Sequence, residues 1–456
     1  MTSRLRLTVL GTGYLGITHA ACMASQGFEV LGVDTDARKA AGLSAGQLPV
    51  FEPGLDELLR DGLDSGRLAF TTSYDQAAAF GDVHFICVGT PLRHDGTGAD
   101  LTQLDGCVTA LAPLLTRPCL VVGKSTVPAG TAAAVAARIA RLAPAGESVQ
   151  LCWNPEFLRE GRAVQDTLAP DRIVIGGASP RAGAVMREIY AGQLAAGAPL
   201  YETDLATAEL AKVAANAFLA TKISFINAMA EVCEAADADV TVLARVLGAD
   251  PRIGAAFLNP GLGFGGGCLP KDIRAFMTRA SDLRAEGAVR LLREVDAINL
   301  RRRAWVAKLA GELADGSVAG EAVCVLGAAF KPGSDDVRDS PALDVAQILH
   351  GMGARVTVYD PVAVDNARRA CPQLRYAGSA EEAAADARVV LLLTEWPEFR
   401  RIDPARLGTV AAARRGVIDA RHVLDQQRWR AAGWDYRAPG VPAAPTASAV
   451  DLNAMP

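Results

Sequence analysis

The sequence lacks the features that would place the chain in a membrane, outside the cell or on a nucleic acid. No stretch approaches the roughly 18 uncharged apolar residues of a membrane span. The N-terminal residues resemble a strand and lack the apolar core of a signal peptide. The net charge is −5, and no long block of like charges occurs. These absences predict a cytoplasmic protein that binds neither nucleic acid nor membrane.

Cysteine and lysine are both used sparingly. The nine cysteines form no CxxC pair and no metal-like spacing with the five histidines, which predicts reduced thiols and no bound metal. The chain has seven lysines and 39 arginines. Since arginine is used almost everywhere for charge, each lysine is a candidate for a site that needs a compact ammonium. Four of the seven fall inside the motifs described below.

A glycine-rich turn near the N-terminus predicts a dinucleotide site. Residues 5–10 form an apolar run, followed by Gly11, Gly13 and Gly16, a helical stretch and a second apolar run that ends at Asp34. This order, with its terminal acid, is typical of a Rossmann unit whose helix N-terminus faces a pyrophosphate. An ordinary turn between strand and helix is the alternative.

Asp34 also favours NAD over NADP. Its carboxylate can accept hydrogen bonds from ribose hydroxyls and would repel a 2′-phosphate. Arg38 and Lys39 follow closely and could accept a phosphate, so NADP stays open. Two further apolar runs lead into Thr90 and into residues 124–126. Ligands of doubly wound sheets bind at the carboxyl ends of strands, so we expect these turns to face the glycine turn.

Residues 203–237 contain neither glycine nor proline and predict one long helix. We expect it to connect two domains and to offer an apolar face for subunit pairing. Glu209, Lys212 and Asn216 are spaced to share one side of this helix. A surface salt bridge is the plain interpretation. Because small and apolar residues surround Lys212 and Asn216, a buried pair that binds something polar or anionic is the alternative we favour.

A second strand-rich half begins near residue 322 and repeats the order of the first, with a strand that ends at Asp360 but without the glycine pattern. Its ligand is therefore expected to differ. The chain as a whole predicts an α/β fold of two Rossmann-like doubly wound sheets joined by a long central helix, divided at 1–200, 201–300 and 301–438. The Pro- and Ala-rich residues 439–456 predict a disordered tail.

The stretch GFGGGCLPKD, residues 263–272, surrounds Cys268 with glycines and places Lys271 and Asp272 close after it. Glycines leave a thiol open to a substrate, and a nearby ammonium favours the nucleophilic thiolate. A tight glycine turn with an incidental thiol is the alternative.

Two other polar segments allow two interpretations each. Glu156 and Glu160 could perform acid/base work or form a solvated helix edge. Lys331 and Arg338 follow a strand and could contact phosphate, or their loop could simply be solvated.

Taken in order, the motifs resemble those of the UDP-glucose 6-dehydrogenase family, within the broader UDP-glucose/GDP-mannose dehydrogenases. The quoted segments are GTGYLG, VGTP, GKSTVPAGT, NPEFLREG, AELAKVAANAFLATKISFIN, DPRIG, GFGGGCLPKD and AAFKPGSDDVRDSP, and the resemblance spans roughly residues 5–425. It implies that two NAD are reduced while the C6 hydroxymethyl of UDP-glucose becomes the carboxylate of UDP-glucuronate.

The resemblance also implies roles for individual residues. Cys268 traps the C6 aldehyde as a thiohemiacetal that becomes a thioester, and water then hydrolyses the thioester. Lys212 and Asn216 steady the oxyanion, and Asp272 serves the water and base steps. Thr126 and Glu156 hold the catalytic water, with Glu156 as the acid/base. The implied cofactor contacts are Gly11, Gly13, Gly16, Asp34, Lys39, Thr90, Thr126, Glu160, Lys271 and Arg338.

The implied substrate contacts lie in four segments, and the C-terminal domain is expected to hold the UDP. They are Glu156, Phe157, Leu158, Arg159, Lys212, Phe264, Gly265, Gly266, Gly267 and Lys331. Arg252 resembles an arginine that reaches the substrate of a neighbouring subunit, which implies a homodimer or a higher oligomer. The chain has Ala228 where the family often has Glu, a difference we expect to affect helix packing more than chemistry.

Three alternatives to UDP-glucose oxidation stay open. The same chemistry could act on GDP-mannose or UDP-N-acetylmannosamine. A two-electron hydroxyacid or 6-phosphogluconate-type dehydrogenase shares the plan of a Rossmann domain and a long helix, but it has no use for Cys268. A non-catalytic NAD-binding sensor is disfavoured because every catalytic position is filled.

Overall fold

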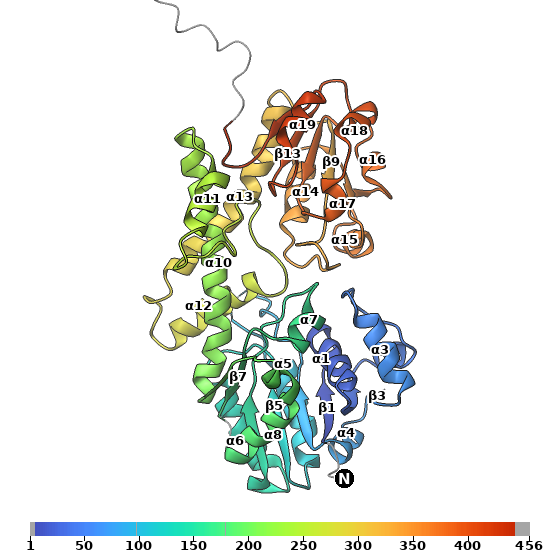
Figure 1. The fold of residues 1–456 in the computed structure, drawn as a ribbon, viewed down its shortest axis with the longest axis vertical. Coiled ribbons are helices and arrows are strands. Elements are labelled where there is room, and N and C mark those ends of the chain that lie inside the picture. The colour runs from blue at the N-terminus through green and yellow to red at the C-terminus, as the bar shows by residue number, and fades with distance from the viewer. Residues whose placement is uncertain (1–4, 97, 178, 443–456) are drawn as a thin grey trace, which may run out of the picture. The chain divides into compact units, whose positions relative to one another are not determined.

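The computed structural model describes residues 5–96, 98–177 and 179–442. The chain divides into two compact units (Figure 1). Unit 1 comprises Met1–Asn216 and Lys271–Val289, and unit 2 comprises Ala217–Pro270 and Arg290–Pro456. Two of the three boundaries fall inside the long helix α10 (Leu205–Ala235) and inside the first turn of α12 (Leu269–Asp282), and the third falls just before α13 (Leu291–Leu313).

Unit 1 is built on an eight-stranded sheet with the order β3-β2-β1-β4-β5-β6-β7-β8. The pairs are parallel except β6 and β7, which are antiparallel and meet at a single residue pair, Trp153 with Gly176. The first six positions follow the order of a dinucleotide-binding sheet. The strands are β1 (Arg6–Leu10), β2 (Glu29–Val33), β3 (Leu68–Thr71), β4 (Val83–Ile86), β5 (Cys119–Gly123), β6 (Val149–Trp153), β7 (Ile173–Gly176) and β8 (Leu200–Thr203).

Helices cover both faces of this sheet. Alternate strand residues point to opposite sides: Leu120 and Val122 of β5 join the cluster under α1, α3 and α8, whereas Val121 joins the one under α4, α5 and α6. The helices are α1 (Tyr14–Ser25), α2 (Ala37–Ser44), α3 (Leu55–Asp64), α4 (Tyr74–Phe80), α5 (Thr102–Leu111), α6 (Thr131–Leu142), α7 (Ala163–Leu168), α8 (Pro180–Ile189) and α9 (Ala191–Ala195), with short 3₁₀ turns at Ala112–Leu114 and Gly146–Ser148.

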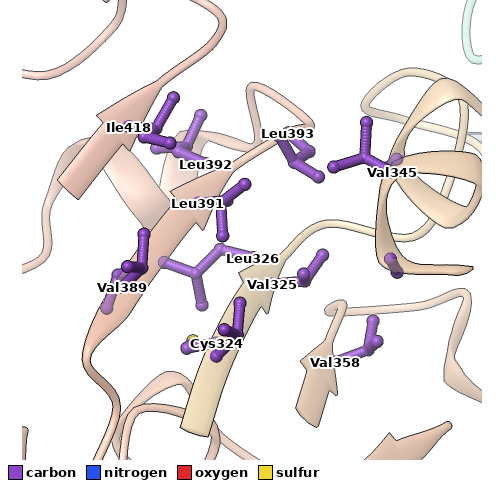
Figure 2. Packing of buried hydrophobic residues seen from close by; sticks show 14 of the residues in the cluster. Cys324, Val325, Leu326, Val345, Val358, Val389, Leu391, Leu392, Leu393 and Ile418 are labelled. Atoms are coloured by element: carbon purple, nitrogen blue, oxygen red, sulfur yellow. The ribbon is translucent and has the colours of Figure 1, made fainter. Parts of the chain in front are cut away.

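Unit 2 carries a second, fully parallel sheet with the order β11-β10-β9-β12-β13-β14. Two of its central strands, β12 (Val389–Leu392) and β13 (Gly416–Asp419), are buried throughout, and β9 (Ala322–Leu326) is buried from Val323 onward. Figure 2 shows Leu393, just after β12, facing Val345 of helix α14 (Pro341–Gly351). The strands are β9 (Ala322–Leu326), β10 (Arg355–Tyr359), β11 (Arg375–Tyr376), β12 (Val389–Leu392), β13 (Gly416–Asp419) and β14 (Asp435–Arg437). The helices are α11 (Val240–Gly248), α13 (Leu291–Leu313), α14 (Pro341–Gly351), α15 (Val364–Ala370), α16 (Ala380–Ala383), α17 (Pro397–Arg400), α18 (Pro404–Val410) and α19 (Gln426–Ala431).

The predicted fold class is confirmed: two mainly parallel α/β sheets occur in one chain, with a long helix between them in sequence. By length and composition α10 could also cross a bilayer, with a mean hydropathy of 1.3 over its most apolar window. However, its N-terminal half buries Glu209, Lys212 and Asn216 among other residues of unit 1. That half of α10 is therefore a core helix.

The predicted tail begins at residue 439, but the chain remains packed slightly beyond that point. The backbone N–H of Gly440 donates to Glu234 at 2.7 Å, and its carbonyl accepts from Val240 at the start of α11. A Cβ at Gly440 would approach Ala230 and Val240 closer than 3 Å. Residues 443–456 of the predicted tail lie outside the described residues.

Candidate active site

The predicted glycine turn connects β1 to α1. Gly11 has φ +90°, and a Cβ there would collide with Val88. A Cβ on Gly16 would lie 1.8 Å from the carbonyl oxygen of Gly11, so Gly16 allows the helix to pack against its own turn. A Cβ on Gly13 would meet nothing within 4 Å. No described side chain caps α1, so the open space at Gly13 and the helix N-terminus fit a pyrophosphate.

Asp34 lies at the end of β2, as predicted, and it faces the same turn. Its carboxylate accepts from the backbone and hydroxyl of Thr12 at 3.0 and 2.8 Å and from Lys39 Nζ at 2.9 Å. Burial alone would raise the pKa of Asp34, but bonds from Lys39, the Asp36 backbone and Thr12 together lower it. The carboxylate is therefore an ionised acceptor. Lys39, predicted as a cofactor contact, forms an ion pair with it.

Glu52 binds the end of the NPEFLREG segment and the residues just after it, and it was not predicted. It is 4% exposed, accepts from the backbone N–H of Gly161 and Ala163, each at 2.6 Å, and accepts from the Tyr14 hydroxyl. Burial and the bond to Glu52 raise the pKa of Tyr14 well above its ordinary value. The buried Glu160 lies in the same segment. No motif could have revealed Glu52, because the backbone groups it binds, at Gly161 and Ala163, are more than 100 residues away.

Lys212 and Glu156 form a buried ion pair, which agrees with the predicted burial of Lys212. Nζ of Lys212 lies 3.2 Å from Oε1 of Glu156, and the side chains are only 5% and 12% exposed. The other Glu156 oxygen accepts from the backbone N–H of Leu158 at 2.8 Å. The Phe157 ring lies 5.6 Å from the Lys212 ammonium. A buried charge needs such a partner, because desolvation otherwise disfavours it.

Asn216, Asp272 and Lys271 form a second polar group in unit 1. The Asn216 amide donates to one oxygen of Asp272 at 2.6 Å, and Lys271 Nζ donates to the other at 2.6 Å. Asp272 is 2% exposed. Lys271, Asp272 and Thr126 all line one cavity of about 250 Å³. Thr90 is bound to this region because its hydroxyl donates to the Thr126 carbonyl at 2.7 Å.

Two side chains near these groups have partners that sequence spacing did not indicate. Glu209 accepts from the backbone N–H groups of Gly130 and Ala132, at 2.7 and 2.6 Å, and thereby caps α6. Although Glu209 shares a helix face with Lys212, its carboxylate stabilises a helix terminus. Arg159, predicted as a substrate contact, binds Asp166 through Nε at 2.9 Å and Nη2 at 2.6 Å. Asp166 raises the pKa of Arg159.

The glycines before Cys268 are required by packing within unit 2. A Cβ on Gly265 would lie 2.1 Å from the carbonyl oxygen of Asp339, and one on Gly266, at φ +85°, would lie 2.7 Å from the Phe330 ring. A Cβ on Gly267 would lie 2.4 Å from the Arg338 guanidinium. The glycine run thus allows close approach of the 330–341 loop, a more specific role than leaving space around the thiol.

Phe264 is held by α13 rather than exposed beside the glycines. Its N–H donates to Asn299 Oδ1 at 2.8 Å, and its carbonyl accepts from Asn299 Nδ2 and from Arg303 at 3.1 Å. Asn299 is fully buried and was not predicted. Of the nine cysteines, all within the described residues, Cys268 alone is exposed.

The other predicted residues of unit 2 differ in exposure. Lys331 is half-buried, and its ammonium lies over the Phe330 ring. Arg252 is 87% exposed and binds Asp250 through Nε and Nη2, the latter at 2.6 Å. Arg338 likewise binds Asp336, at 2.6–2.9 Å.

The second sheet differs from the first at the turn after its first strand. Asp360, at the end of β10, accepts from the N–H groups of Ala328 and Ala329 and from Trp396 Nε1 at 3.0 Å. Its other oxygen accepts from Val362 and Ala363, and the residue is 2% exposed. Both carboxylate oxygens thus accept hydrogen bonds from the protein itself. This agrees with the expectation that the second sheet binds a different ligand from the first.

The open turn at Gly13 and the ionised Asp34 at the end of β2 define a dinucleotide-binding α/β protein. Comparison with known proteins gives the family. Residues 5–194 match the NAD binding domain of the UDP-glucose/GDP-mannose dehydrogenase family, 206–301 its central domain and 324–426 its UDP binding domain. The chain belongs to this family.

Individual relatives match along nearly the whole chain. A UDP-glucose 6-dehydrogenase of Rhizobium meliloti (strain 1021) is 42% identical over 440 residues, which cover 96% of this chain and 100% of the relative. The solved UDP-glucose dehydrogenase of Pyrobaculum islandicum is 37% identical with a TM-score of 0.88, covering 97% and 99% of the two chains. A UDP-D-ManNAc dehydrogenase of Pyrococcus horikoshii is 27% identical with a TM-score of 0.84, covering 96% and 99%.

Proposed function

We propose that the protein oxidises UDP-glucose to UDP-glucuronate in two NAD-dependent steps that share one covalent intermediate on Cys268. The observation that carries the proposal is the combination of a single exposed cysteine with the buried Lys212–Glu156 and Asn216–Asp272 pairs. A two-electron alcohol oxidation needs a base but no thiol. An aldehyde that must survive an exchange of cofactor needs a covalent anchor.

Bound NAD supplies the acceptor for the hydride lost in each oxidation. The Cys268 thiol adds to the C6 aldehyde: a C–S bond forms, and the S–H proton passes to the carbonyl oxygen, which becomes a hydroxyl. Loss of a hydride from C6 and of the hydroxyl proton leaves a thioester. Water then adds to the thioester, the C–S bond breaks, and the sulfur leaves as thiolate. Cys268 directly precedes α12, whose N-terminal partial charge favours an anionic sulfur.

The other chain groups act on oxygen and protons. Lys212 and Asn216 donate to the oxygen that becomes negative when sulfur or water adds to C6. Glu156 and Thr126 hold the attacking water, and Glu156 takes its proton. Asp272 keeps Asn216 oriented through their 2.6 Å hydrogen bond and assists the base steps. The cofactor is bound by the glycine turn together with Asp34, Lys39, Thr90, Glu160, Lys271 and Arg338.

We further propose where the nucleotide sugar and the second subunit bind. The sugar nucleotide contacts Phe157, Leu158, Arg159, Lys331 and the segment from Phe264 to Gly267. The C-terminal domain, 301–438, binds the UDP part. The protein acts as a cytoplasmic homodimer. Support for pairing comes from the exposed residues Phe218, Phe225 and Val232, spaced seven apart on α10, and from the exposed Val242 and Val246 of α11. Arg252 of one subunit then reaches the substrate of the other.

A panel of nucleotide sugars tests the substrate. NADH formation is measured at equal concentrations with UDP-glucose, UDP-N-acetylmannosamine and GDP-mannose, and with 6-phosphogluconate as a comparison compound that is not a nucleotide sugar. We expect kcat/KM for UDP-glucose to exceed each of the others by at least about 100-fold, since discrimination against a substrate that leaves buried polar groups unpaired is large. A preference for UDP-N-acetylmannosamine would contradict the proposed substrate and would favour the activity named for the Pyrococcus horikoshii relative.

A further inference from the structure

Lys124 is a buried lysine that the proposed reaction does not use. It follows β5, is 6% exposed, and donates to Asn154 Oδ1 at 2.9 Å and to the Tyr190 hydroxyl at 3.2 Å. Tyr190 in turn donates to the same Asn154 oxygen at 2.6 Å. Both acceptors are neutral, so the hydrogen bonds of this ammonium neutralise no charge. A buried ammonium in such a setting is costly and calls for a functional reason.

The Lys124 network sits where the sheet of unit 1 is most weakly paired. β6 and β7 share a single residue pair, and the chain leaves β6 at Asn154. There the Asn154 side chain donates to the Val174 carbonyl of β7 at 2.8 Å, while its backbone N–H donates to Gly123 of β5 at 2.8 Å. Lys124 and Tyr190 fix the orientation of this amide. The network thus replaces the missing ladder between the two strands.

Glu156 is two residues beyond Asn154, with Pro155 restricting the backbone between them. Lys124, Asn154, Tyr190 and Glu156 all line one small cavity of about 60 Å³. Loss of the hydrogen bonds that tie the Asn154 side chain to Val174, Lys124 and Tyr190 would therefore loosen the start of the segment that carries Glu156. Rigid support of this kind controls catalysis because a displacement of about 1 Å can cost on the order of 100-fold in rate.

We propose that Lys124 is a positioning residue that sets the place of Glu156 through Asn154, with Tyr190 as the second clamp. The inference rests on the proposed function for the role of Glu156, but the clamp itself does not depend on any substrate. Lys124 acts at a distance and touches none of the reacting atoms.

The test compares Lys124→Met with Tyr190→Phe, Glu156→Gln and the double variant Lys124→Met/Glu156→Gln. We expect Lys124→Met to lower kcat by about 10- to 100-fold with less than about threefold change in either KM. The double variant should be no slower than Glu156→Gln alone, because both changes act through one group. Lys308→Met, a 77% exposed lysine on α13, is the matched control and should leave kcat unchanged.

Hydrogen exchange of the substrate-free protein separates this inference from the proposed function. Amides of residues 154–162 should exchange faster in Lys124→Met and in Tyr190→Phe than in the wild type, while those of α1 stay unchanged. Unchanged exchange at 154–162, or rate losses that multiply in the double variant, would overturn the inference. If Lys124→Met does not fold, Tyr190→Phe alone decides it by the same two readouts. Failure of the wild type to oxidise UDP-glucose would instead overturn the proposed function.

Discussion

The ammonium nitrogen of Lys212 lies 3.2 Å from a carboxylate oxygen of Glu156, and both side chains are almost removed from solvent. The two residues come from α10 and from the segment after β6, 56 residues apart in sequence. Removing one member of a buried ion pair leaves the other uncompensated, at a cost of about 3–5 kcal/mol. The pair is therefore both a structural link and the centre of the proposed acid/base chemistry.

Replacing Lys212 by Met should lower kcat by on the order of 100-fold or more, because a donor to the developing oxyanion is lost. The unfolding midpoint should fall as well. A double-mutant cycle with Glu156→Gln measures the coupling, which we expect to exceed about 1 kcal/mol in unfolding free energy for groups in contact. Additive single effects would mean that the two charges do not depend on one another.

Asp34 should govern the choice of dinucleotide. Asp34→Ala should weaken NAD binding about tenfold or more, since hydrogen bonds to a charged acceptor are worth about 1.5–3 kcal/mol. The difference between the affinities for NAD and for NADP should also become smaller. Isothermal titration measures both affinities. Asp36→Ala, which removes the N-terminal cap of α2, is the matched control and should leave NAD affinity unchanged. Equal affinities of wild type and Asp34→Ala for NAD would contradict the assignment.

The lowered pKa of Asp34 also predicts a pH dependence. The folded pKa lies below its ordinary value of 3.8. The stabilisation from the ionised carboxylate is therefore fully present above about pH 4 and is lost as pH falls through the folded pKa. The difference in thermal midpoint between wild type and Asp34→Asn should be constant from pH 5 to pH 8. A difference that grew steadily over that range would show that another group is responsible.

Glu209 is expected to matter for stability at the start of α6. Glu209→Ala leaves the N–H groups of Gly130 and Ala132 without their acceptor, which should cost about 1–3 kcal/mol of unfolding free energy. Urea unfolding followed by circular dichroism measures the change. Glu312→Ala on α13, where the glutamate is 60% exposed, is the matched control and should have little effect. An unchanged midpoint in Glu209→Ala would show that water replaces the cap.

Subunit pairing is tested at the centre of the apolar stripe on α10. Phe225→Glu places a charge among Phe218 and Val232 and should convert the dimer to monomer in light scattering coupled to gel filtration. Activity should fall with dissociation if Arg252 acts across the interface. Val410→Glu, at an exposed apolar position on α18, is the control and should remain dimeric. A monomeric wild type, or an active monomeric variant, would contradict the proposed assembly.

The sequence predicted those features that depend on local patterning. The Gly11–Gly16 turn, Asp34 at a strand end and one long helix over 203–237 all follow from spacing and periodicity, and the structure contains each. Burial of Lys212 was also predicted, from its small and apolar neighbours. Spacing could not show which side chain each polar group would meet.

The contacts that sequence could not reveal join distant parts of the chain. Glu209 shares a helix face with Lys212, yet it meets the N-terminus of α6, 77 to 79 residues away. Glu52 meets the 161–164 segment more than 100 residues away. The glycines before Cys268 suggested an open approach, whereas their close neighbours are the loop residues Asp339 and Arg338. These pairings are set by tertiary packing, which leaves no periodic signal.

The count of NADH per sugar tests the covalent mechanism most directly. A limiting amount of UDP-glucose is incubated with excess NAD until absorbance stops rising, with wild type and with Cys268→Ala. The account predicts two NADH per UDP-glucose for the wild type, with UDP-glucuronate as the product, and loss of this turnover in Cys268→Ala. One NADH per sugar in the wild type, or undiminished turnover in Cys268→Ala, would contradict the account.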